Sequence, residues 1–85
     1  MSNIVIIIGR ILEFQDENYI KVVTTRNFKN ADGVYESDFI EIKLSEIIMN
    51  KTKEYCKKGD LVSIKGRIES GNIIVAESIT FLNSN

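Results

Sequence analysis

Histidine, tryptophan and proline are absent from this chain of 85 residues, and cysteine occurs only once. Without histidine, the chain lacks the usual general base of enzymes and the commonest metal ligand of proteins. The single cysteine, Cys56, excludes an internal disulfide and any cysteine–histidine nucleophile pair, and it fits a reducing compartment. The 12 acidic residues show no recognised catalytic spacing. We therefore predict a protein that is not an enzyme and that uses no metal or cofactor.

Long apolar runs and a strong net charge are also missing. The longest uninterrupted apolar run is Ile4–Ile8, far short of the roughly 20 residues that span a membrane, and no secretory signal is visible. Eleven basic residues nearly balance the acidic ones and give a net charge of −1, so any track that binds an anionic polymer must be local. The hydrophobic content of 44% is ordinary for a globular protein. We expect one domain over residues 1–85 and no membrane partner.

Alternating apolar residues and turn signals predict five strands and one helix. Asn30–Gly33 and Ser70–Asn72 have the composition of tight turns, and Ser45 and Gly59 are typical of the two ends of a helix. The predicted strands are Asn3–Leu12, Tyr19–Thr25, Glu36–Leu44, Leu61–Glu69 and Ile73–Leu82, and the predicted helix is Ser45–Lys58. This order favours an all-β OB-fold, a five-stranded Greek-key barrel with one α-helix between strands three and four.

The first predicted strand is apolar on both faces. We expect Ile4, Ile6 and Ile8 to face the core, and Val5 and Ile7 to need a second cover. Such an apolar strand is prone to associate with other chains, and pairing with its own copy would remove the exposed edge. We therefore expect a homodimer or homotetramer built through this strand.

Gly9 within that strand suggests a bend or a bulge. In the fourth strand, Val62, Ile64 and Ile68 should face inwards together with Gly66. On the predicted helix, the buried stripe should contain the following residues: Ile48, Thr52, Tyr55 and Cys56.

Two phenylalanines stand out on the polar side of the pattern. Phe39 alternates with the buried side of its strand, so it should face outwards, and Phe28 lies between Arg26 and Lys29. Exposed aromatic rings beside cations suit single-stranded nucleic acid, since bases stack on the rings while the cations follow the phosphates. The alternative is that Phe28 closes one end of the barrel and Phe39 packs under a partner subunit.

Further cations add to this candidate surface. Lys65 and Arg67 should face outwards together on the fourth strand, and Arg10 and Lys43 extend the same electrostatic surface. Glu41 shares the face of Phe39 and works against phosphate binding. The candidate nucleic-acid-binding residues are Arg10, Arg26, Phe28, Lys29, Phe39, Lys43, Lys65 and Arg67.

Several segments, taken in order, resemble the bacterial single-stranded DNA-binding protein (SSB) family over nearly the whole chain. They are Asn3–Ile11, Arg26–Asn30, Asp38–Ile40, Glu54–Gly59, Val62–Ile68 and Ala76–Leu82. The resemblance implies an OB barrel that binds single-stranded DNA with little sequence preference in replication, repair and recombination. It also implies assembly into dimers or tetramers through the first strand, and a location in the cytoplasm with the nucleoid.

In the family, bases stack on a few aromatic residues, and Phe28 and Phe39 match two of these positions. A third position is Ser45 here, and a fourth falls in a hairpin that is shortened to Ser70–Asn72. The family's acidic C-terminal tail has no counterpart among these residues, so the chain resembles a minimal member. It is also similar to primosomal replication protein B, which is built on the same barrel.

Two alternatives stay open at this point. One is a protein-interaction subunit of a replication or primosome complex, with other replication proteins as partners, and the other is an RNA-binding domain.

Overall fold

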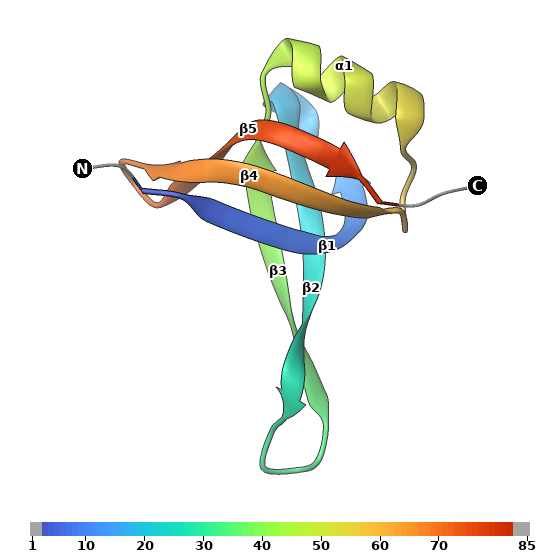
Figure 1. The fold of residues 1–85 in the computed structure, drawn as a ribbon, viewed down its shortest axis with the longest axis vertical. Coiled ribbons are helices and arrows are strands. Elements are labelled where there is room, and N and C mark those ends of the chain that lie inside the picture. Colours follow the sequence, from blue (N-terminus) through green and yellow to red (C-terminus); the bar gives the residue numbers. More distant parts are fainter. Residues whose placement is uncertain (1–2, 83–85) are drawn as a thin grey trace.

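The computed structural model describes residues 3–82, which form a barrel of five strands with one α-helix (Figure 1). The elements are β1 (Val5–Phe14), the 3₁₀ turn η1 (Asp16–Asn18), β2 (Tyr19–Lys29), β3 (Tyr35–Lys43), α1 (Glu46–Tyr55), β4 (Leu61–Glu69) and β5 (Ile73–Phe81). The strands close the barrel in the order β1-β2-β3-β5-β4. All neighbours are antiparallel except β3 and β5. The predicted OB-fold, with its helix between the third and fourth strands, is confirmed.

The second strand is longer than predicted and continues to Lys29 rather than Thr25. Beyond Thr25, β2 and β3 leave the barrel as a two-stranded arm, which extends downwards in Figure 1. The predicted turn over Asn30–Gly33 ends this arm. The Gly33 N–H donates to the Asn30 carbonyl oxygen at 3.0 Å, and Gly33 has a φ of +77°.

The inward face of β1 is the opposite of the predicted one. Ile4, Ile6 and Ile8 are between 57% and 67% exposed, whereas Ile7 and Ile11 are buried in the core. Both faces of this strand are rich in isoleucine, so an alternating pattern cannot decide which face is buried.

Gly9 explains why the odd-numbered positions of β1 turn inwards. A Cβ atom at Gly9 would lie 2.5 Å from the carbonyl oxygen of Val23 and 2.6 Å from a side-chain carbon of Val22. Such distances are shorter than van der Waals contact, so only glycine fits where β1 crosses β2. The neighbouring even-numbered isoleucines must therefore point away from the barrel interior.

The helix starts as predicted and ends earlier than predicted. The Ser45 hydroxyl accepts a hydrogen bond from the Ile48 N–H at 3.1 Å, which is the expected N-cap contact. The last helical residue is Tyr55, and Cys56 is extended. Gly59, with a φ of +92°, belongs to the turn before β4, where its N–H donates to the carbonyl oxygen of Ile11. No helix within residues 3–82 has the length and apolar character needed to cross a membrane.

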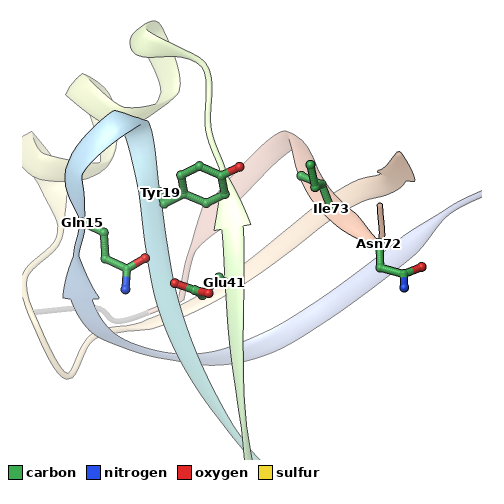
Figure 2. Close-up of a pocket in the computed structure, with 5 residues that line it drawn as sticks. All are labelled: Gln15, Tyr19, Glu41, Asn72 and Ile73. Atoms are coloured by element: carbon green, nitrogen blue, oxygen red, sulfur yellow. The ribbon is translucent and has the colours of Figure 1, made fainter. Parts of the chain in front are cut away.

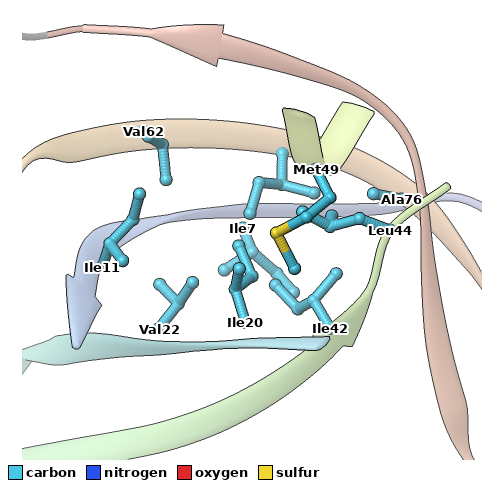
Figure 3. Close-up of a cluster of buried hydrophobic side chains, with 10 residues drawn as sticks. Ile7, Ile11, Ile20, Val22, Ile42, Leu44, Met49, Val62 and Ala76 are labelled. Atoms are coloured by element: carbon cyan, nitrogen blue, oxygen red, sulfur yellow. The ribbon is translucent and has the colours of Figure 1, made fainter. Parts of the chain in front are cut away.

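Ten hydrophobic side chains form the buried core inside the barrel (Figure 3). They are Ile7, Ile11, Ile20, Val22, Ile42, Leu44, Met49, Val62, Ile64 and Ala76. Met49 reaches this core from α1, although the predicted helical stripe did not include it.

Two residues predicted to be buried are exposed. Tyr55 lies at the end of α1 with its ring 5.8 Å from the ring of Phe81, and most of its surface faces solvent. Ile68 is on the same side of β4 as the core residues Val62 and Ile64, but it lies near the end of the strand and is exposed. Both predictions were wrong because each residue lies at or near the end of its element, where periodicity does not show how far the core extends.

Candidate nucleic-acid interface

The arm formed by β2 and β3 presents Phe28 outside the barrel. Phe28 is 63% exposed, so it does not close the end of the barrel. Beside it in the chain, the Lys29 ammonium lies 5.7 Å from the centre of the Tyr35 ring, in the range of a cation–π contact. Asn30 stiffens the tip, because its side-chain oxygen accepts hydrogen bonds from the N–H groups of Asp32 and Val34. The arm therefore carries two accessible aromatic rings and a cation away from the core.

Phe39 lies on the outer face of the barrel, as predicted, and is 64% exposed. Its Cα partner on β2 is Val23, and the Cα partner of Val23 on β1 is Arg10. The Arg10 guanidinium donates to the carbonyl oxygen of Gly59 at 3.0 Å. Since the Phe39 ring is not packed in the core, its face is available to stack on a base.

Arg26 is engaged by two carboxylates on β3. Its guanidinium binds both oxygens of Asp38, at 3.1 and 3.0 Å, and one oxygen of Glu36 at 3.1 Å. The hydrogen bond from Arg26 is the main cause that holds the pKa of Asp38 below its ordinary value. Bidentate arginine–carboxylate pairs use the same donors that would bind a phosphate, so a phosphate must compete with Asp38 for Arg26.

Arg67 on β4 has the same kind of environment. Its guanidinium contacts Glu69 at 2.7 Å and Glu77 at 3.2 Å. The hydrogen bond with Glu69 is the largest cause that raises the pKa of Arg67. Arg26 and Arg67 are thus the two predicted phosphate contacts that already have acidic partners.

The remaining predicted cations, Lys29, Lys43, Lys65 and Arg10, take part in none of the ion pairs formed by residues 3–82. Lys43 is exposed at the end of β3. Lys65 is exposed on β4 beside Ile6. These cations give the outer surface local positive charge despite the net charge of −1.

The eight predicted residues form three groups rather than one cluster. Arg26, Phe28 and Lys29 lie on the arm. The second group lies on the outer face of the barrel. In it, Arg10 and Phe39 belong to one row across β1, β2 and β3, and Lys43 is further along, at the end of β3. The third group, on β4, contains Lys65 and Arg67.

A pocket of about 310 Å³, which the sequence did not predict, opens beside these groups (Figure 2). It is lined by Gln15, Tyr19, Glu41, Asn72 and Ile73. The residues come from four parts of the chain: the β1–β2 connection, the start of β2, β3 and the β4–β5 hairpin with the start of β5. The alternating pattern of β2 and β3 does place Tyr19 and Glu41 on one outer face. Only the long-range pairing of β3 with β5 brings the hairpin to the same place.

Comparison with known proteins agrees with this architecture. Residues 2–80 match the model of the Single-strand binding protein family. The chain is 33% identical over 79 residues to single-stranded DNA-binding protein B of Bacillus subtilis, and the match covers 82% of this chain and 70% of that protein. It is also 33% identical over 81 residues to single-stranded DNA-binding protein 1 of Streptococcus pyogenes, covering 85% of this chain and 62% of the relative.

Solved structures share the barrel. The mitochondrial single-stranded DNA binding protein of S. cerevisiae superposes with a TM-score of 0.74 at 25% identity, over 100% of this chain and 99% of the other. A Plasmodium falciparum SSB complex with ssDNA has the same fold, with a TM-score of 0.71 at 14% identity, covering 98% and 96% of the two chains. On the match of residues 2–80, this chain belongs to the Single-strand binding protein family.

Proposed function

We propose that this chain binds single-stranded DNA, with little sequence selectivity, in replication, recombination and repair. Bases stack on Phe28 and Phe39, and the eight residues predicted from the sequence supply the aromatic rings and phosphate contacts. The observation that carries the proposal is the exposure of both rings on a barrel of the Single-strand binding protein family. Each stacked base contributes about 1–3 kcal/mol, and the contact tolerates any base.

Two observations support this proposal over other readings of the sequence. Phe28 lies on the arm and closes no end of the barrel. Family membership favours DNA binding over a role as a protein-interaction subunit. We expect the chain to work in the cytoplasm, at the nucleoid.

The proposal is tested by fluorescence anisotropy with labelled oligo(dT), oligo(rU) and duplex DNA of equal length. We expect tight binding to oligo(dT), which weakens steeply as salt is added because phosphate contacts release counterions. Equal affinity for duplex, or no binding to oligo(dT) at low salt, would overturn the proposal. Tighter binding to oligo(rU) than to oligo(dT) would assign the chain to RNA instead.

We further propose that the chain forms a homodimer or homotetramer through β1. Ile4, Ile6 and Ile8 form an exposed apolar row on its outer side. The first half of β1 pairs with β4, and its registered pairing with β2 begins only at Arg10. A second copy of the strand would cover the isoleucines and pair with the exposed backbone edge of β1. The sequence pattern predicted the same kind of association, but with Val5 and Ile7 as the covered residues.

Light scattering tests this assembly. Ile6→Lys should shift the wild-type oligomer towards a folded monomer, and Ile47→Lys, on the exposed side of α1, should leave the mass unchanged. Substitution of Ile7 is unsuitable as a test because Ile7 belongs to the core, and a lysine there would unfold the chain. A wild-type chain of monomer mass at high concentration would contradict the proposal.

A further inference from the structure

The pocket beside Glu41 has the size and the walls of a small ligand site. Its volume of about 310 Å³ lies at the low end of ligand pockets, which suits a single planar base better than a larger molecule. It opens on the outer side of β2 and β3, the side that carries Phe39. A strand of DNA that stacks on Phe39 therefore passes close to its mouth.

Tyr19 supplies a stacking surface in this pocket. The residue is half-buried at the start of β2, and in Figure 2 its ring extends from β2 towards β3. Its Cα partner on β3 is Lys43, which is exposed. An aromatic ring with a cation one strand away is the arrangement that holds a base and its phosphate.

Among the polar groups that line the pocket, Glu41 is the one that carries a charge. The Gln15 side-chain amide donates one hydrogen bond to the Glu13 carboxylate at 2.8 Å. Lys21, the Cα partner of Glu41, has its ammonium 3.8 Å from Glu13. Of the ion pairs formed by residues 3–82, none includes Glu41. In the view of Figure 2, the Gln15 amide and the Glu41 carboxylate both lie below the Tyr19 ring.

A carboxylate beside a stacking ring repels phosphate and accepts hydrogen bonds from a base that has donors on its edge. Guanine offers a ring N–H and an adjacent amino group, which match the two oxygens of a carboxylate. Adenine and cytosine offer one amino group each, whereas thymine offers one ring N–H and no amino group. We propose that this pocket is a base-recognition site, an inference that rests on the proposed function. In this site, Tyr19 stacks on the base, and Glu41 favours bases that carry an amino group, guanine above all.

The test compares oligonucleotides that differ in one base. The probes are a short oligo(dT), the same oligo(dT) with one internal deoxyguanosine, and a third with deoxyinosine there, which lacks the amino group. We expect the guanine probe to bind about fivefold more tightly than oligo(dT). This value is at the low end of the discrimination that a bidentate contact provides, because Glu41 is exposed to solvent. The inosine probe should bind no more tightly than oligo(dT), because hypoxanthine, like thymine, offers one ring N–H and no amino group.

Two variants separate recognition from charge. Glu41→Gln should reduce the guanine advantage to less than about twofold, since one carboxylate oxygen is replaced by a donor. Glu54→Gln removes an equal charge from the exposed surface of α1 and should preserve the ratio. Equal binding of all three probes by the wild type, or an unchanged ratio in Glu41→Gln, overturns this inference alone. A chain that binds none of the probes overturns the proposed function as well.

Discussion

Replacing Phe39 by alanine should weaken DNA binding and leave the fold intact. The ring is 64% exposed, so its removal opens no core cavity, and the free energy of unfolding should change by less than about 0.5 kcal/mol. The loss of one stacked base should cost about 1–3 kcal/mol of binding free energy. This corresponds to a rise of roughly 5- to 150-fold in the Kd for oligo(dT).

Binding at this position can be followed by tryptophan fluorescence, because the unmodified chain contains no tryptophan. A Phe39→Trp variant places a single indole at the position under test and should retain the affinity, because indole also stacks on bases. Its fluorescence should fall as oligo(dT) is added. Ile47→Ala is the matched control, because Ile47 is an exposed apolar residue on α1, away from the proposed interface.

An unchanged Kd in folded Phe39→Ala would refute the stacking role of this residue. The same conclusion would follow if the indole of Phe39→Trp did not respond to bound oligo(dT). A loss of affinity in Ile47→Ala as large as that in Phe39→Ala would show that the effect is not local.

Lys65→Gln should make the slope of log affinity against log salt concentration shallower by about 0.7, the value for one phosphate contact with a single strand. An unchanged slope would show that Lys65 does not contact DNA. Asp38→Asn should tighten binding to oligo(dT) more than Glu54→Gln does, because it releases Arg26 for a phosphate; equal effects would mean that Arg26 stays away from DNA. Since Arg26 lowers the pKa of Asp38 in the folded chain, their contribution to stability is present at neutral pH and is lost as the pH falls through that lowered pKa. In an NMR titration, Arg26→Gln should raise the Asp38 pKa towards the ordinary value of an aspartate, and no change would contradict the pairing. Gly9→Ala should reduce the free energy of urea unfolding by about 1–3 kcal/mol because the added carbon overlaps the backbone of β2, and an unchanged unfolding midpoint would contradict that packing.

The order of strands and the place of the helix could be predicted because each depends on local signals. Asn30–Gly33 and Ser45 mark a turn and a helix start through their own hydrogen bonds. The facing of β1 depends instead on a contact between Gly9 and β2, which lies more than ten residues away in the chain. No periodicity within β1 contains that information, since both of its faces are apolar.

The candidate site was predictable only in part for the same reason. Alternation within β3 was enough to place Phe39 on the outer face. The partners of Arg26 depend on the register between β2 and β3, which brings Asp38 and Glu36 to its guanidinium. The pocket at Glu41 depends on the pairing of β3 with β5, a contact between distant segments of the chain.

Mapping of backbone amide NMR shifts during a titration with oligo(dT) tests the proposed DNA interface without any substitution. We expect the largest shifts on the arm at Phe28 and Lys29, and on the outer face of the barrel around Phe39. The amides of α1 should remain unchanged. Shifts confined to α1, or no shifts at saturating oligo(dT), would contradict the proposed interface.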